Sequence, residues 1–496
     1  MCLKNNIPII FLLINLLTNS IFLNSQVHLG PGQAFANVQA AVNAKAIYPG
    51  DTVYLHAGSY AGYQLIQNLN GTAHQWIIFT KYKNDLIDIS GGWQFVSCSY
   101  LRFQNLTFRG NTNHPGRLFS VDNGGSCNTQ SKYIQVDQCE FSNTLDAKAI
   151  VAFKFAGVDS FEVTRNIFKD IRVCSAMDFN TCRNGIIRGN RIENCLTGGH
   201  IKGGGRNITL EQNLFSNASF SPWVAFELGG DTSPQFYCPE DQFEVKNIYF
   251  YSNIVVGGYR GIALSSARDC KIINNTFHNC SQATLRFLNT SVLYPSLSDN
   301  IIENNIFSFG TSAYFNGSTQ TLSAASFSHN IYYSFNTVIF NGPYWDTPQL
   351  DAIKDENPLL YGSATAMFEN MSMNNFKLFS SSPAIYKGKP QIEPMFDFYG
   401  KPFSTTARSI GAIEFEMTSD EHSALTEIIT WTIVPNPVEN YFMIKAEQSK
   451  LQFELFNSEG NKMIEFNSGE TIQMSNFSSG IYYVRQNNVV QKLVKF

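Results

Sequence analysis

A short pattern recurs through the middle of this chain: an asparagine, one further residue, and then an aromatic or branched residue. The copies follow one another at intervals of 22 to 40 residues, and a unit of that length cannot bury its own apolar face. Neighbouring units must therefore stack, which predicts a solenoid. The copies are Asn166-Ile-Phe168, Asn190-Arg-Ile192, Asn213-Leu-Phe215, Asn253-Ile-Val255, Asn275-Thr-Phe277, Asn305-Ile-Phe307 and Asn330-Ile-Tyr332.

The repeats have the composition and the alternation of β-strands. Segments such as Phe161-Glu-Val163 and Ile208-Thr-Leu210 alternate with a period of two, and long stretches with a helical period are missing. We therefore expect an all-β fold, a right-handed parallel β-helix over residues 26–416. Asparagine tolerates the left-handed backbone region, so we expect each recurring Asn at a sharp bend, hydrogen-bonded to its copies in the neighbouring coils.

The sequence also predicts the two ends of the solenoid and one insertion between its coils. Residues 34–43 form an amphipathic pattern, which predicts a short helix that caps the first coil. The longest interval, before Asn253, contains an insertion at about residues 229–243, and long loops on rigid scaffolds often carry function. Segments 382–385 and 409–415 are interpreted as the closing parts of the solenoid.

The first residues predict export. Lys4 precedes the apolar run 9–17, which is typical of a signal peptide over residues 1–25 and too short for a membrane span. No later stretch is apolar enough to span a membrane, so we expect no transmembrane segment.

The charge balance and the cysteine spacing limit the kinds of partner and metal site that we expect. With 35 basic and 39 acidic residues the chain has no large basic field, which argues against nucleic acid as a partner. The ten cysteines show no paired CxxC spacing, so we expect buried thiols with a disulfide or two rather than a cysteine metal site. We expect a monomer.

The C-terminal residues 433–496 differ from the repeats, and a polar linker over residues 417–432 precedes them. Short alternating strands with intervening turns predict a small antiparallel β-sandwich. Four segments resemble the C-terminal sorting domain of type IX secretion cargo from Bacteroidetes: Val434-Pro-Asn-Pro-Val-Glu-Asn440, Phe456-Asn-Ser-Glu-Gly460, Ser479-Gly-Ile-Tyr-Tyr-Val484 and Lys492-Leu-Val-Lys-Phe496. The resemblance implies that the type IX machinery is a partner and that the protein is secreted or attached to the cell surface.

Alignment of the coils predicts a column of charged side chains. Phe153, Met177, Ile201 and Phe226 recur at intervals of 24 or 25 residues and are expected to point inward. The residue after each then points outward, with neighbouring strands about 4.8 Å apart. These residues are Lys154, Asp178, Lys202 and Glu227, and two coils later Arg286 takes the same position.

Such a column suits elimination from a uronate sugar, which needs a base and a cation opposite the carboxylate. Lys202 or His200 is the candidate base, and Lys154, Arg206 and Arg260 are candidate substrate-binding residues. The insertion adds Asp231, Glu240 and Asp241, whose carboxylates are candidate ligands for Ca²⁺.

Three segments resemble bacterial β-helix proteins related to pectate-lyase-like and chondroitinase-B-like enzymes: His200–Asn213, Tyr237–Ile248 and Asn253–Gly258. The resemblance covers about Val27 to Phe415. It implies an acidic polysaccharide as substrate and a Lys and an Arg in catalysis, roles that Lys202 and either Arg286 or Arg260 fill.

Three other interpretations stay open. Alternating charges in a column are attractive cross-strand pairs that stabilise a stack without any catalysis. Asp178 and Glu227 could instead be the two carboxylates of a glycoside hydrolase. A non-catalytic surface protein that binds glycans or cells is the third, since this scaffold hosts many functions.

Overall fold

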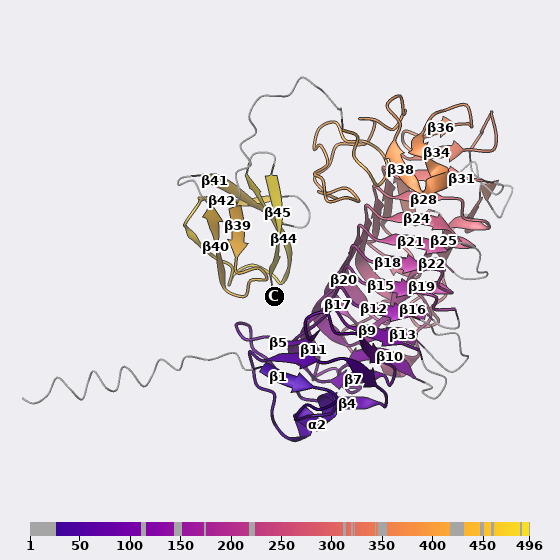
Figure 1. The fold of residues 1–496 in the computed structure, drawn as a ribbon. Coiled ribbons are helices and arrows are strands. Elements are labelled where there is room, and N and C mark those ends of the chain that lie inside the picture. The colour runs from indigo at the N-terminus through magenta and orange to yellow at the C-terminus, as the bar shows by residue number, and fades with distance from the viewer. Residues whose placement is uncertain are drawn as a thin grey trace, which may run out of the picture.

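The computed structural model shows a parallel β-solenoid followed by a small antiparallel domain (Figure 1). The expected signal peptide and most of the expected linker lie outside the described residues. The structure describes residues 26–110, 116–142, 151–172, 175–217, 224–310, 314–318, 321, 323–342, 344–345, 355–416, 431–446, 451–457, 461–486 and 489–495. The all-β solenoid expected from the repeats is thereby confirmed.

Three sheets run along the solenoid, and every strand pairs in parallel with the equivalent strand of the next coil. Sheet A consists of β1 (Gln26–Leu29), β2 (Thr52–Leu55), β5 (Ile77–Lys81), β8 (Ser99–Gln104), β11 (Ser131–Asp137), β14 (Val158–Thr164), β17 (Arg183–Arg188), β20 (Gly205–Glu211), β23 (Val245–Tyr251), β26 (Ala267–Arg268), β27 (Lys271–Ile273), β30 (Asn300–Glu303) and β33 (Ala325–Ser328). Sheet B consists of β3 (Gly58–Tyr60), β6 (Ile87–Ile89), β9 (Thr107–Arg109), β12 (Glu140–Ser142), β15 (Ile167–Lys169), β18 (Arg191–Glu193), β21 (Leu214–Asn217), β24 (Ile254–Gly257), β28 (Thr276–His278), β31 (Ile306–Phe309), β34 (Ile331–Ser334) and β36 (Leu359–Tyr361). Sheet C consists of β4 (Gln64–Gln67), β7 (Trp93–Val96), β10 (Arg117–Asp122), β13 (Val151–Ala156), β16 (Ser175–Asn180), β19 (Thr197–Lys202), β22 (Val224–Gly229), β25 (Arg260–Ser265), β29 (Ala283–Leu288), β32 (Tyr314–Asn316) and β35 (Tyr344–Trp345).

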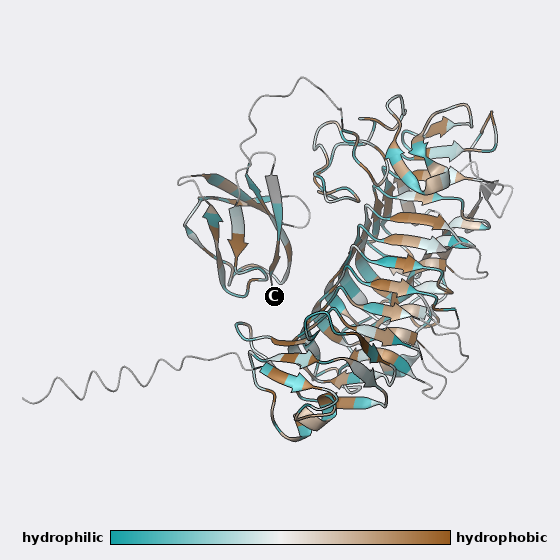
Figure 2. Ribbon diagram, in the orientation of Figure 1, coloured by the Kyte–Doolittle hydropathy of each residue, from teal (hydrophilic) through white to brown (hydrophobic). Residues whose placement is uncertain are grey.

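The core is one continuous column of apolar side chains inside the three sheets. Equivalent positions of successive coils stack directly: the rings of Phe108, Phe141 and Phe168 are parallel, with centroids 5.0 and 4.9 Å apart. Figure 2 shows hydrophobic and hydrophilic residues alternating along these strands. Side chains that point inward are thus apolar. Side chains that point outward can be polar or charged, and they determine the chemistry of each face.

The recurring asparagines form the expected buried ladder. Asn190 Oδ1 accepts hydrogen bonds from the backbone N (2.9 Å) and from Nδ2 (3.0 Å) of Asn166, and the same arrangement continues along the stack. The backbone expectation was wrong, because the residue before each ladder Asn takes the left-handed conformation, for example Arg165 (φ 54°) and Gln212 (φ 59°). The Asn itself is needed for its side chain, since Oδ1 accepts from one coil while the two N–H groups of Nδ2 donate to the next amide and to a backbone carbonyl.

Removal of one ladder amide is expected to destabilise the solenoid. The fully buried Asn213 accepts from Asn190, and its Nδ2 donates to Asn253 Oδ1 (3.0 Å) and to Ile187 O (2.9 Å). Asn213→Ala leaves these partners buried and unpaired, which is expected to lower the free energy of unfolding by about 2–4 kcal/mol. Thermal or denaturant unfolding measures the effect, and the exposed Asn289→Ala serves as the control. Equal stability of the two variants would contradict the structural role of the ladder.

The capping elements differ in detail from the expected ones. Helix α2 (Val38–Asn43) is shorter than residues 34–43, because the Asn37 side chain caps it by accepting from Ala40 N. At the other end, segments 382–385 and 409–415 do not form coils of their own. Instead they pack, with the hairpin β37 (Phe368–Asn370) and β38 (Asn375–Leu378) around η2 (Met371–Met373), against the outward side chains of sheet B.

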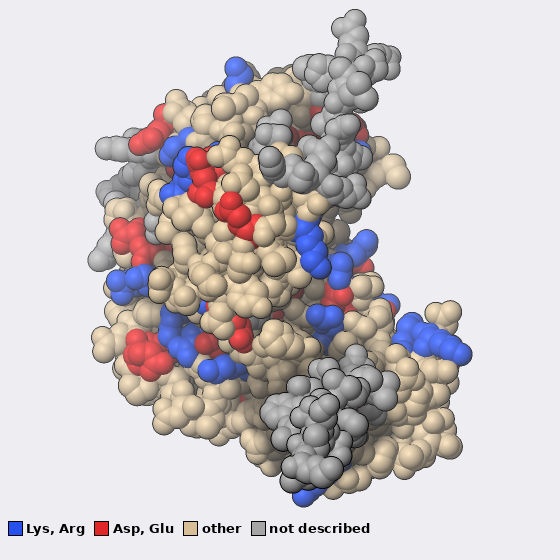
Figure 3. Space-filling view, turned by 90° about the vertical axis from the view of Figure 1, so that its left-hand side faces the viewer, with Lys and Arg blue, Asp and Glu red and all other residues tan. Residues whose placement is uncertain are grey.

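The C-terminal domain has its own core and two antiparallel sheets, as the alternating strands predict. One sheet consists of β39 (Trp431–Val434), β40 (Tyr441–Ala446) and β43 (Thr471–Gln473), and the other of β42 (Lys462–Asn467), β41 (Gln452–Phe456), β44 (Gly480–Gln486) and β45 (Val489–Lys495). Among the described residues, no helix is long and apolar enough to cross a membrane. On the face shown in Figure 3, acidic and basic residues are interspersed, and no extended basic field that would suit nucleic acid is visible there.

Candidate active-site groove

An open groove on sheet C has a volume of about 650 Å³, and the loops after its strands form one wall. Its charged lining residues are Arg117, Asp122, Lys154, Asp178, Lys202 and Asp231. Four of these, Lys154, Asp178, Lys202 and Asp231, were expected from the sequence. All lining residues come from the solenoid, between Tyr63 and Cys238.

The register of sheet C confirms most of the expected charge column and corrects one position. Lys154 pairs with Asp178, which pairs with His200, and His200 pairs with Glu227. The alignment that placed Lys202 in this column was wrong, because the coil between Asp178 and His200 is two residues shorter than the preceding one. Met177 therefore pairs with Gly199, and Ile201 pairs with Phe179 rather than with Met177.

Asp178, which lines the groove, lies beside Lys154 and His200. Its carboxylate forms an ion pair with Lys154, and His200 Nε2 lies 2.8 Å from Asp178 Oδ1. The exposed fractions of the three side chains are only 19%, 10% and 20% for Lys154, Asp178 and His200. Burial would raise the pKa of the Asp178 carboxyl, but His200 and Lys154 outweigh it and hold this pKa well below its usual range. Asp178 is thus an anion that orients both neighbours.

Lys202 lies in a second outward column, next to the loops. It pairs with Asn180, which pairs with Ala156, and Ala156 pairs with Asp122. Within the described part of the chain, the Lys202 ammonium forms no hydrogen bond or ion pair, although the residue lines the groove. It is therefore available to a ligand, whereas Lys154 is already held by Asp178.

The insertion forms the wall of the groove and is fixed at both ends. A disulfide joins Cys127, in the loop after β10, to Cys238, just after η1 (Pro234–Phe236). The buried Glu244 accepts from Thr232 N (2.8 Å) and Gly203 N (3.0 Å), which ties the insertion to the turn after Lys202. The expectation of a disulfide is confirmed, and the described cysteines 98, 139, 182, 195, 270 and 280 are buried thiols.

Two of the three acidic residues of the insertion are paired with arginines. Asp241 is buried and forms an ion pair with Arg206, and Glu240 lies 3.6 Å from Arg183 Nη1. Asp231 lies apart from this pair, lines the groove and accepts from Val292 N (3.1 Å). Cys238, which lies close to Glu240 and Asp241, is committed to the disulfide. Cationic partners already occupy two of the proposed ligands, so no chemical step is derived through Ca²⁺ from these residues.

The other candidate residues lie outside the groove lining. Glu227 accepts from the Ser265 hydroxyl (2.5 Å), and Arg286 donates to Asn316 Oδ1 (3.3 Å), farther along sheet C. Arg260 donates to Gln282 Oε1 (2.5 Å) at the opposite edge of the sheet. Arg206 is held by Asp241. The structure therefore does not gather these arginines at Lys202.

The sequence did not single out the N-terminal part of the groove. Gln94 donates to Asp122 Oδ2 (2.6 Å) and accepts from the Tyr63 hydroxyl, and Arg117 lies beside them in the lining. These coils precede the clear copies of the Asn repeat, so alignment of the repeats could not place their outward residues. Exposed rings of Tyr63 and Phe236 border the same region.

Comparison with known proteins identifies the C-terminal domain. Residues 432–496 match the family model of the secretion system C-terminal sorting domain. The protein is therefore exported by the type IX secretion machinery and is secreted or located at the cell surface. A comparison with curated proteins found no match.

Solved structures similar to this chain include two lyases and an adhesin. A pectate lyase is 12% identical with a TM-score of 0.49, and the match covers 79% of this chain and 98% of that chain. A rhamnogalacturonan lyase is 10% identical with a TM-score of 0.42, covering 77% and 96%. A surface adhesin of Streptococcus pneumoniae is 12% identical with a TM-score of 0.36, covering 70% and 91%. At these values the similarities carry no argument about activity.

Proposed function

We propose that this protein is a lyase that cleaves an acidic, uronate-containing polysaccharide by β-elimination in the sheet C groove. The observation that carries the proposal is the Lys202 ammonium, which lines the groove beside the Lys154–Asp178–His200 network without an ion-pair partner among the described residues. A groove with one uncommitted ammonium group suits a substrate that brings its own carboxylate.

The reaction assigns distinct tasks to these side chains. The base removes the proton from C5 of the uronate, the bond between C4 and the glycosidic oxygen breaks, and a C4–C5 double bond forms. Lys202 Nζ accepts the C5 proton, and the departing oxygen takes a proton from solvent. Arg117 offsets the charge that develops on the carboxylate.

His200 is less suited to act as the base than Lys202. Its Nε2 lies 2.8 Å from Asp178 Oδ1, and His200 is not among the residues that line the groove. A hydrolase with Asp178 as general acid is also disfavoured, because such an acid needs a raised pKa and that of Asp178 is depressed.

The test is a substrate screen with the full chain. Pectate, alginate and glycosaminoglycans are incubated with the protein, with and without added Ca²⁺, while ultraviolet absorbance and new reducing ends are recorded. A lyase is expected to raise both signals in proportion, because each cleavage creates one unsaturated uronate and one reducing end. Reducing ends without absorbance would indicate a hydrolase, and binding without either signal would indicate a non-catalytic glycan-binding protein. Each of these two results would overturn the proposal.

A further inference from the structure

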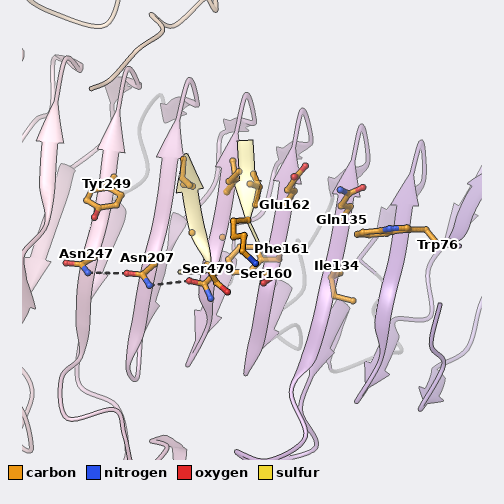
Figure 4. A pocket seen from close by; sticks show the side chains of 17 residues that line it. Trp76, Ile134, Gln135, Ser160, Phe161, Glu162, Asn207, Asn247, Tyr249 and Ser479 are labelled. Carbon is orange, nitrogen blue, oxygen red and sulfur yellow. Dashed lines mark hydrogen bonds between the residues drawn. The ribbon is translucent and has the colours of Figure 1, made fainter. Parts of the chain in front are cut away.

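The sorting domain lies against the outer face of sheet A, on a different side of the solenoid from the groove. Figure 4 shows strands of this domain beside the strands of sheet A. A cavity of about 200 Å³ separates them locally, with Asn207 and Asn247 on the solenoid side and Ser479 and Lys495 on the side of the domain.

A buried charge cluster joins the sorting domain to the solenoid. Lys492 Nζ of β45 lies 3.2 Å from Glu211 Oε1 of β20, and Arg188 Nε of β17 donates to the same oxygen at 2.7 Å. The exposed fractions of the Lys492 and Glu211 side chains are 11% and 17%. Burial would raise the pKa of Glu211, but Lys492 and Arg188 outweigh it and lower this pKa to about 2. Burial lowers the pKa of Lys492, so its charge depends on Glu211.

Two further contacts fix the orientation of the domain. Phe456 and Tyr483 of the domain pack with Met395 of the solenoid in a small apolar cluster. At the other end, the hydroxyl of Tyr100 in β8 donates to Glu439 Oε1 at 2.8 Å. Contacts at three separate places determine both position and rotation.

The contact is discontinuous, unlike a domain core. Besides the first cavity, a cavity of about 220 Å³ lies near Trp76 and Pro437, and a larger one of about 810 Å³ lies near Tyr386 and Phe456. An interface interrupted in this way and centred on an ion pair resembles a separable contact more than a fused core.

We propose that the outer face of sheet A is a docking surface for the chain's own sorting domain, with the Glu211 carboxylate as the receptor for the Lys492 ammonium. In the docked state β44 and β45 face the solenoid, so secretion machinery that binds these strands must displace them from sheet A. The groove on sheet C stays accessible, because its lining contains no residue of this domain.

The test uses the full chain with a specific protease site introduced into the 417–430 segment. After cleavage, the wild-type sorting domain is expected to remain bound to the solenoid in size-exclusion chromatography. Glu211→Lys and Lys492→Glu each place like charges together in a buried site, which is expected to weaken the complex by a factor on the order of 30 or more. The double variant restores one anion beside two cations, so co-elution is expected to return.

The rescue by the double variant separates loss of docking from loss of folding. Lys445→Glu, at an exposed position of β40 in the same domain, is the matched control and is expected to leave co-elution unchanged. Separate elution of the cleaved wild-type domain, or intact complexes of both single variants, would overturn the docking proposal. Neither result depends on any catalytic activity.

Discussion

Lys202→Ala is expected to lower kcat/KM for the cleaved polysaccharide by about 10²–10⁴-fold, the contribution typical of a positioned general base. The Lys202 ammonium has no hydrogen bond or ion pair within the described residues, so its removal breaks no structural contact there. The free energy of unfolding is therefore expected to change by less than about 0.5 kcal/mol. Initial rates of absorbance change and a thermal unfolding curve measure the two quantities.

Two companion variants distinguish the roles of this residue. Lys202→Arg keeps the positive charge but cannot accept a proton near neutral pH, so it is expected to be as inactive as the alanine variant if Lys202 is the base. If Lys202 instead neutralises the substrate carboxylate, Lys202→Arg keeps most of the activity. Lys132→Ala, at an exposed position on sheet A, is the control for loss of a lysine. Wild-type rates for Lys202→Ala would place the chemistry elsewhere.

Asp178→Asn is expected to reduce both activity and stability. The change keeps the shape of the side chain but removes the anion beside Lys154 and His200, leaving the Lys154 ammonium without its ion-pair partner in a largely buried site. Loss of such charge-assisted contacts is expected to cost about 1–3 kcal/mol of unfolding free energy. Because both neighbours lose their orientation, kcat/KM is expected to fall by about 10²-fold.

The stability difference is expected to depend on pH in a defined direction. The pKa of Asp178 is lower in the folded than in the unfolded protein, so its contribution is complete above the unfolded value of about 4. It is lost as the pH falls below that value toward the folded pKa. Unfolding curves of wild type and Asp178→Asn should therefore differ most above about pH 5 and converge in acid.

Asp269→Asn, in an exposed ion pair, is the control for Asp178→Asn. Asp269 lies 3.6 Å from Lys246 in an exposed pair, with 38% of its side chain accessible, so Asp269→Asn is expected to change stability by less than about 0.5 kcal/mol. If Asp178→Asn behaves like this control at neutral pH, the buried network does not stabilise the floor of the groove.

The repeat pattern predicted the fold well because ladder and core positions constrain the sequence in every coil. Asn166, Asn190 and Asn213 lie where their spacing placed them, each bonded to the next. The outward positions were predicted less well, since coil length varies between the fixed points. A coil two residues shorter than its neighbour moved His200, rather than Lys202, beside Asp178.

Contacts between residues that are far apart in the chain could not be predicted from the sequence. The Cys127–Cys238 disulfide closes a separation of 111 residues, and no local spacing marked these two cysteines among the ten. Likewise, Glu211 and Lys492 are ordinary surface residue types in their own segments. Only the packing of whole elements brings such residues together, which explains why the wall of the groove and the docking surface were not predicted.

The asparagine ladder has a direction and ends in an anion. In every rung Oδ1 accepts from the preceding Asn, while Nδ2 donates to Oδ1 of the following Asn and to a backbone carbonyl of the preceding coil. The side-chain amides therefore share one orientation, and their small dipoles add up as peptide dipoles do in an α-helix. After Asn330 the acceptor is Asp355 Oδ2, which lies 2.9 Å from Asn330 Nδ2. A carboxylate at that position meets the positive end of the column, as an acidic residue does at a helix N-terminus. Since an ionised carboxylate has no hydrogen to donate, it also sets the point at which the chain of amides stops.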